Sequence, residues 1–406
     1  MQIALTTFQM KRIGGISQFI VDLVGDLGRR GHQVTVVALS PGDGWARLVA
    51  AGLNGVCLKQ QRFESQFHFT RHIARYLKHG GFDAVINNID IRNGVAQRCL
   101  RFLPPPMARL AVLHSTKPAV FELAAVNRHV YDAVVAVSPG MQALAAAHLP
   151  GQAVSCIPNG IRRPTGDPAG QRRGWSSPLR LLFVGRLENR AKNVVLLPEI
   201  VAECKQRGLA VTLTIVGDGR DRPLLEQAIS SSAVGHLIEL RGAQPPEAIY
   251  PVMQEHHALL LPSNFEGLPL TLLEAQLNGC VPVASALPGS TDSAVKAGVT
   301  GLLAPPGDAA AFARQVAVLA DPERWRTFSQ AAMARAQAEF TVEIMGERYE
   351  RLLGDLTADR AALAHRRGKP DSLRRLFTWQ DFLPPPLQRR LLRLTTVGYK
   401  ARGGNR

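Results

Sequence analysis

The sequence predicts an α/β protein built on two doubly wound parallel sheets. Short apolar runs alternate with helical patterns in both halves of the chain, as in consecutive βαβ units. A polar stretch rich in glycine and proline, residues 159–178, interrupts this alternation near the middle. The length of 406 residues is also too great for one ordinary core, so two or three domains are expected.

The first domain is predicted over residues 1–158, with amphipathic helices at 16–30 and 67–78. The chain opens on an apolar run without the charged start and long apolar core of a signal peptide, so a strand is expected there. The predicted strands cover residues 2–6, 33–39, 84–87, 109–113, 133–137 and 153–157.

The second domain is predicted over residues 179–340, after the linker at 159–178, and it repeats the same alternation. Its strands are expected at residues 179–184, 211–216, 238–240, 258–261, 281–284 and 301–304. Its helices are expected at residues 193–207, 222–230, 270–278, 309–319 and 322–338.

Two further segments follow the second domain. Residues 341–357 have a strongly helical pattern, and residues 358–406 form a basic tail with amphipathic pieces. Within the tail, leucine and arginine at 387–394 fit a helix lying on a membrane surface. Packing of the tail onto the enzyme body or a second subunit, and disorder, are the open alternatives.

The formal net charge of +16 is unevenly distributed. Residues 1–158 contain 16 Lys/Arg and 8 Asp/Glu, residues 159–355 contain 20 and 21, and residues 356–406 contain 12 and 3. A nucleic-acid-binding surface over the whole protein would not separate charge in this way, and no nucleic-acid partner is expected. An anionic membrane or an anionic lipid-linked acceptor, facing the first domain and the tail, fits the distribution.

The five cysteines are scattered, without the spacing of metal ligands, which favours reduced thiols in a cytoplasmic protein. No run of 18 apolar residues occurs, so no transmembrane helix is expected. Together with the basic regions, this predicts a cytoplasmic protein that is peripheral on the inner face of the plasma membrane.

Two carboxylates eight residues apart, Glu266 and Glu274, follow the predicted strand at 258–261. Between them lie a turn and a helix N-terminus, whose unpaired N–H groups and positive dipole end suit a phosphate. A carboxylate beside a phosphate is repelled unless it holds something else, such as sugar or ribose hydroxyls, so the pattern favours a sugar nucleotide. The alternative is a glutamate that complements the helix dipole and an unrelated surface glutamate. The turn residues are Gly267, Leu268, Pro269 and Leu270.

A second turn carries two fixed cations. The predicted strand at 179–184 runs into Gly185, and Arg186 and Lys192 bracket the turn that follows. Open α/β sheets bind ligands at the carboxyl ends of their strands. A guanidinium fork and an ammonium point charge together suit a diphosphate, although surface loops often carry both residue types.

Together these two segments resemble the retaining GT-B glycosyltransferases of family 4, whose pattern is a Gly-Arg-Leu…Lys turn followed by Glu-x7-Glu. The resemblance covers about residues 1–357 and implies a GT-B fold. In that fold two Rossmann-like domains face a central cleft, the first binding the acceptor and the second the donor, and a helix at 341–357 crosses back to the first domain. Similar pieces occur in the family order at residues 14–16, 30–36, 157–161, 215–219, 279–285 and 289–292.

The resemblance also implies roles for the site residues. Arg186 and Lys192 would clamp the donor diphosphate without a metal, helped by backbone N–H groups of residues 267–270. Glu274 would hold the ribose hydroxyls, and Glu266 would contact the donor sugar near the reacting centre. No cofactor is expected beyond the nucleotide-sugar co-substrate, for which UDP is the default because it is common in the family. An Asp-x-Asp metal motif is not apparent at a suitable strand end.

Three residues of the first domain join these candidates. Gly14 and Gly15 lie between the first strand and helix, where glycine would let a phosphate or the donor sugar approach the backbone; a plain tight turn is the alternative. His114 follows the strand at 109–113 and, by the same resemblance, would contact the donor sugar. A purely structural histidine is the alternative there.

The expected function is retaining sugar transfer from a nucleotide-sugar to a saccharide or lipid-linked acceptor, in cell-surface polysaccharide or lipopolysaccharide biosynthesis. Two alternatives stay open. One is a sugar-nucleotide epimerase or hydrolase on the same fold. The other is a basic binding protein without enzymatic activity.

Overall fold

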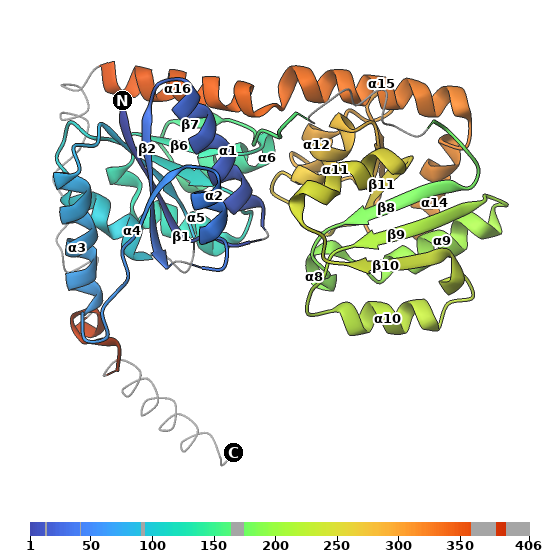
Figure 1. The fold of residues 1–406 in the computed structure, drawn as a ribbon, viewed down its shortest axis with the longest axis horizontal. Coiled ribbons are helices and arrows are strands. Elements are labelled where there is room, and N and C mark those ends of the chain that lie inside the picture. Colours follow the sequence, from blue (N-terminus) through green and yellow to red (C-terminus); the bar gives the residue numbers. More distant parts are fainter. Residues whose placement is uncertain (13, 41, 91–93, 164–173, 359–378, 387–406) are drawn as a thin grey trace, which may run out of the picture.

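The computed structural model describes residues 1–12, 14–40, 42–90, 94–163, 174–358 and 379–386. It contains two parallel sheets, each covered by helices, which lie next to each other under a pair of long helices (Figure 1). The predicted fold class, two Rossmann-like doubly wound domains, is therefore confirmed. Of the predicted basic extension, only residues 358 and 379–386 are among those described.

The first sheet has seven parallel strands in the order β3-β2-β1-β4-β5-β6-β7. Six were predicted, and the seventh, β3, was not. Its residues are Asn-Gly-Val-Cys at an exposed edge, so it lacks the apolar run by which buried strands are recognised. The strands are β1 (Gln2–Gln9), β2 (Gln33–Ser40), β3 (Asn54–Cys57), β4 (Ala84–Asn88), β5 (Ala108–Leu113), β6 (Ala133–Ala136) and β7 (Val154–Cys156).

The second sheet has six parallel strands in the order β10-β9-β8-β11-β12-β13, all at predicted positions. Central strands such as β11 are buried on both faces, which explains their continuous apolar sequences. The strands are β8 (Leu179–Val184), β9 (Val211–Val216), β10 (Ile238–Gly242), β11 (Ala258–Leu261), β12 (Val281–Ser285) and β13 (Leu302–Ala304).

Helices cover both faces of each sheet. Those of the first domain are α1 (Gly15–Arg29), α2 (Trp45–Ala50), α3 (Gln66–His79), α4 (Gly94–Cys99), α5 (Pro118–Val126) and α6 (Pro139–His148). The second half contributes α8 (Asn189–Lys192), α9 (Leu196–Gln206), α10 (Arg222–Ser230), α11 (Pro246–Glu255), α12 (Leu270–Leu277), α13 (Thr291–Ala294), α14 (Ala309–Val318), α15 (Pro322–Glu339) and α16 (Val342–Ala358). Short 3-10 turns are η1 (Leu100–Phe102), η2 (Arg128–Val130), η3 (Gly235–Leu237) and η5 (Trp379–Phe382).

One predicted helix begins later than expected. The pattern at 193–207 predicted a helix from residue 193, but Asn193 adopts a left-handed conformation, with φ of 49°, and the helix observed there, α9, starts at Leu196. Asparagine accepts this conformation more readily than most residues. The one-turn helix α8, which ends at Lys192 just before Asn193, was not predicted.

The chain passes between the domains twice, and the two passages are joined. Ile161 forms a parallel bridge with Thr341, with hydrogen bonds from Ile161 N to Phe340 O (2.8 Å) and from Val342 N to Ile161 O (3.1 Å). A Cβ on Gly160 would lie 2.6 Å from the Val342 Cα, so only glycine allows this approach.

The helix that follows this bridge, α16, packs on α1 of the first domain. Tyr349 is fully buried there, with its ring 6.0 Å from that of Phe19. Arg30 binds Glu350 across the same contact at 3.1 Å. As a result, a segment that follows the second sheet in sequence belongs to the core of the first domain.

Both sheets reverse their strand order at a defined point. The order changes between β1 and β4 in the first sheet and between β8 and β11 in the second. Such switch points are where doubly wound sheets bind ligands, beyond the carboxyl ends of the strands. The loops after β1, β8 and β11 contain Gly14, Arg186 and Glu266, so the topology brings the predicted site residues to these points.

Candidate donor-binding site

Glu266 is the centre of a small polar cluster in the loop after β11. Its Oε1 accepts hydrogen bonds from Lys192 Nζ (2.5 Å) and Ser263 Oγ (2.7 Å). The side chains of Glu266 and Lys192 are only 10% and 20% exposed. Within the described part of the chain, no hydrogen bond reaches Oε2. The cluster therefore fixes one carboxylate oxygen and leaves the other available to a ligand hydroxyl.

The second predicted cation is placed differently. The Arg186 side chain is 73% exposed and lies 3.3 Å from Glu188, which also contacts Arg220 at 3.2 Å. The structure thus brings Lys192 and Glu266 together but leaves Arg186 on a surface ion pair. Exposed pairs of this kind contribute roughly 0–1 kcal/mol, so a diphosphate could draw the guanidinium away from Glu188 at little cost.

Two helix N-termini meet across the cleft. A Cβ on Gly15, the first residue of α1, would lie 3.5 Å from Cδ1 of Leu270, the first residue of α12. No side chain in the described ranges caps either helix, and neither helix has an acidic residue in its first turn. Both positive dipole ends are therefore left without a compensating carboxylate, as expected of an anion site formed by two helices.

The turn before α12 passes very close to the first domain. A Cβ on Gly267 would lie 2.9 Å from the carbonyl oxygen of His114 and 3.3 Å from the sulfur of Met141. A side chain here would push the domains apart. Leu268 is buried, and Pro269 precedes the helix as its N-cap residue, so the turn has a fixed path. Gly14 and Gly185 lie in the corresponding turns after β1 and β8.

Glu274 lies one turn into α12, and no side chain or backbone group of the described residues donates a hydrogen bond to its carboxylate. Burial raises its pKa to about 7, and the charge of Asp22 adds to the shift. Asp22 belongs to α1 of the other domain and is itself buried, accepting hydrogen bonds from Gln18 and Arg162. Two carboxylates from opposite domains therefore share one low-dielectric region.

His114 is held at the end of β5. Its Nε2 lies 2.9 Å from Asn88 Oδ1, and Asn88 Nδ2 donates to Thr6 O at 3.3 Å. That arrangement assigns the ring proton to Nε2. Burial lowers the pKa of His114 to about 4, so the ring is neutral at pH 7. Its Nδ1 is buried, has no hydrogen-bond partner among the residues that the structure describes, and can accept a hydrogen bond from a hydroxyl.

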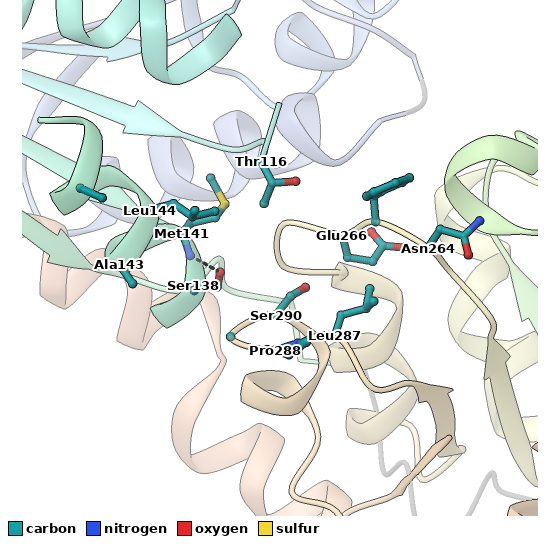
Figure 2. Close-up of a pocket in the computed structure, with 14 residues that line it drawn as sticks. Thr116, Ser138, Met141, Ala143, Leu144, Asn264, Glu266, Leu287, Pro288 and Ser290 are labelled. Atoms are coloured by element: carbon teal, nitrogen blue, oxygen red, sulfur yellow. Dashed lines mark hydrogen bonds between the residues drawn. The ribbon is translucent and has the colours of Figure 1, made fainter. Parts of the chain in front are cut away.

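A cavity of about 470 Å³ lies beside Glu266, between the domains (Figure 2). Met141 and Leu144 of α6 face it from the first domain, and Leu287 and Ser290 from the second. The domains also touch directly at its edge, where Gly140 N donates to Gly289 O at 2.8 Å. The cavity therefore adjoins the carboxylate that was expected to contact the donor sugar.

Sequence reasoning missed the residues that support these groups. Ser263 and Asn88 orient Glu266 and His114, but neither stands in a recognisable pattern. Asp22 could have been found, because it falls on the buried face of a helix whose neighbours there are Phe19, Leu23 and Val24. A charge in an apolar stripe is a signal of function or pairing.

Comparison with known proteins agrees with this architecture. The model of the family described as "Glycosyltransferase Family 4" matches residues 13–163, and that described as "Glycosyl transferases group 1" matches residues 178–321. The chain belongs to the family 4 glycosyltransferases. The predicted family is thus confirmed, because the two family models together match both domains.

The chain is similar to two curated relatives and to one solved structure. The amylovoran biosynthesis glycosyltransferase AmsK of Erwinia amylovora is 33% identical over 174 residues, 41% of this chain and 42% of that protein. The putative colanic acid biosynthesis glycosyltransferase WcaL of Escherichia coli K12 is 26% identical over 186 residues, 44% of this chain and 45% of that protein. The match therefore spans less than half the length of either relative.

The solved structure is that of Anabaena Alr3699/HepE in complex with UDP and glucose. Its TM-score is 0.74 at 18% identity, covering 87% of this chain and all of that one. At this identity the likeness shows the fold, which is GT-B.

Among the described residues, no group of three or more His, Cys, Asp or Glu side chains is placed to hold a metal ion. None of the helices in the described ranges is both long and apolar enough to cross a bilayer.

Proposed function

We propose that this protein transfers a sugar from a nucleotide-sugar donor to a saccharide or lipid-linked acceptor, with retention of anomeric configuration and without a metal. The observation that carries the proposal is the Lys192–Glu266–Ser263 cluster beside two uncapped helix N-termini. A pathway of cell-surface polysaccharide or lipopolysaccharide is supported by the names of the relatives, which concern amylovoran and colanic acid.

The donor diphosphate would lie between the N-termini of α1 and α12. Charge grows on its leaving oxygen as the glycosidic bond breaks, and fixed cations and backbone dipoles stabilise that charge. Lys192 supplies the near cation, and Arg186 joins it by leaving Glu188. Backbone N–H groups of residues 267–270 and of Gly14 and Gly15 complete the cradle.

The remaining contacts orient the nucleoside and the sugar. Glu274, inside α12, would accept hydrogen bonds from the ribose hydroxyls, and Oε2 of Glu266 from the donor sugar. The unpaired Nδ1 of His114 would accept a hydrogen bond from a sugar hydroxyl on the opposite side of the cleft. UDP is the proposed nucleotide, a choice supported by the bound UDP of the Anabaena structure.

The acceptor would enter the cavity between α6 and Glu266, where its hydroxyl can reach the donor sugar (Figure 2). The basic first domain and tail suit an anionic acceptor that is attached to the inner face of the plasma membrane. We place the protein there as a peripheral protein.

The test is a thermal-shift panel of UDP-, GDP-, ADP- and CMP-sugars, with and without EDTA, on the wild type and on Glu274→Ala. One nucleotide class should stabilise the wild type, irrespective of EDTA, and should fail to stabilise the variant. The product made from that donor should keep the donor's anomeric configuration by NMR. Stabilisation that requires a divalent metal would contradict the metal-free mechanism, and release of free or epimerised sugar without an acceptor would indicate a hydrolase or epimerase instead.

A further inference from the structure

The outer face of α3 carries an unusual concentration of positive charge. This helix lies at the edge of the first domain that faces away from the second domain (Figure 1). Its 14 residues include no Asp or Glu. The residues of what we term the α3 basic face are exposed or nearly so, and recur every three or four positions: His68, Arg71, Arg75, Lys78 and His79.

The acidic side chains near this face are already engaged. Glu64, just before the helix, lies 3.4 Å from His72, and Asp381 lies 3.2 Å from Arg98. Within the described ranges, no carboxylate forms an ion pair with Arg75 or Lys78. Such cations attract an extended anionic surface.

An exposed aromatic side chain extends the face. Phe63 is 70% exposed in the loop before α3, and the Arg62 guanidinium lies 5.5 Å from its ring centre. An exposed phenylalanine next to cations is typical of proteins that bind at a membrane interface, where the ring enters the apolar boundary and the cations contact headgroups.

The last described segment of the chain is attached to the same helix. The Phe382 ring lies 4.8 Å from that of Phe67 in the first turn of α3. From this point the sequence continues through residues 387–406, which contain six Lys/Arg and no Asp/Glu.

We infer that the α3 basic face, together with Arg62 and Phe63, is the surface by which this protein docks on an anionic phospholipid bilayer. Charge complementarity selects the bilayer, and the exposed ring distinguishes it from a purely ionic partner. The surface lies on the outer edge of the first domain and includes none of the donor-site residues. The inference rests on the peripheral membrane location proposed above and names the surface that makes the contact. Because the donor site lies elsewhere, loss of vesicle binding and loss of sugar transfer can be told apart.

The test is co-sedimentation of the full chain with phosphatidylcholine vesicles, with and without phosphatidylglycerol. The variant is Arg71→Gln/Arg75→Gln/Lys78→Gln. Its matched control removes three exposed cations of the second domain, as Lys205→Gln/Arg314→Gln/Arg324→Gln. Each surface cation contributes about fivefold to binding of an anionic membrane, so the first triple variant should bind roughly 100-fold more weakly. The control should bind like the wild type.

Further measurements distinguish a phospholipid bilayer from other anionic partners. Phe63→Ala should weaken the vesicle binding measured at high salt. Salt screens the cations, so the binding that remains there comes from insertion of the apolar ring. Donor-induced thermal shifts should be equal in all variants, which also shows that they are folded. Equal losses in the two triple variants, or binding that is the same without phosphatidylglycerol, would overturn the inference. Tighter binding of an anionic oligonucleotide than of anionic vesicles, lost in the same variant, would assign the face to another polyanion.

Discussion

At the scale of single residues, the site contains ionisable side chains in buried positions, where their charged forms are disfavoured. Glu274 and Asp22 come from opposite domains, and both carboxyl pKa values are raised, mainly by burial. His114 is held neutral by burial, with one nitrogen unpaired. Such groups weaken the ligand-free fold but are ready to bind hydroxyls.

The stability of the protein should therefore depend on pH through the ionisation of Glu274. Its pKa in the folded state, about 7, lies above the ordinary value of 4.5, so the fold favours the protonated form. The free energy of unfolding falls as pH rises from about 4.5 through 7, because over this range the unfolded chain has released the Glu274 proton while the folded protein still holds it. We expect Glu274→Gln to match the wild type in thermal unfolding at pH 5 and to exceed it at pH 8.

The same substitution should abolish donor-induced stabilisation at both pH values. In the wild type, donor affinity should increase as pH rises through about 7, because the ionised carboxylate is the better acceptor for ribose hydroxyls. A wild-type affinity that is flat between pH 5 and 8 would argue against this role.

Lys192 offers a second test at this scale, with a control on the same helix. Arg190 is exposed on α8 two residues earlier. If Lys192 stabilises the leaving diphosphate, Lys192→Gln should lower kcat by on the order of 10²-fold or more, while Arg190→Gln should leave it nearly unchanged. Similar rates for the two variants, measured by release of the nucleoside diphosphate, would exclude the assignment.

At the scale of elements, close backbone contacts determine how the domains meet. Gly140 is the second residue of α6, and a Cβ there would lie 2.8 Å from the backbone of Gly289. A Cβ on Gly28, inside α1, would meet no atom of the described residues within 4 Å. Both are helical glycines, but only one faces the other domain.

Alanine at these two positions should therefore act differently. Alanine favours a helix over glycine by about 1 kcal/mol, so neither Gly140→Ala nor Gly28→Ala should destabilise its own domain. Gly140→Ala should nevertheless hold the cleft open, raise the radius of gyration in small-angle scattering, and lower turnover by on the order of 10²-fold. A normal radius and turnover for Gly140→Ala would show that the contact is dispensable.

What the sequence predicted, and what it missed, also divides by element. All six strands of the second sheet were predicted. Central strands such as β11 and β12 have continuous apolar sequences because they are buried on both faces. The edge strand β3 lacks such a sequence. The late start of α9 follows from the left-handed conformation of Asn193, a single backbone angle that no periodicity records. The motif residues Glu266 and Lys192 were found, but their partner Ser263 follows only from the folded loop.

At the scale of the whole molecule, α16 makes the first domain depend on a helix that follows the second. Tyr349 is its largest buried side chain, and the buried Tyr349 hydroxyl has no hydrogen-bond partner in the described part of the chain. We expect Tyr349→Ala to lower the free energy of unfolding by about 3–5 kcal/mol, as for other large-to-small aromatic changes. Tyr349→Phe should be neutral or stabilising, since it removes an unsatisfied polar group.

Chemical denaturation with separate probes of the two domains would measure both effects. Loss confined to the second domain in Tyr349→Ala would mean that α16 does not support the first domain. A destabilised Tyr349→Phe would instead reveal a hydroxyl partner, such as an ordered water.

The paired passages at Ile161 and Thr341 have a further consequence. Peptide bonds cross from one domain to the other at two neighbouring points, and those points are hydrogen-bonded to each other. Cutting one passage leaves the other intact, with α16 still seated on α1. The gene could therefore be divided between residues 163 and 174. The two polypeptides, made separately, would associate through the contact of α16 with α1 and the bridge between Ile161 and Thr341, and would form one enzyme.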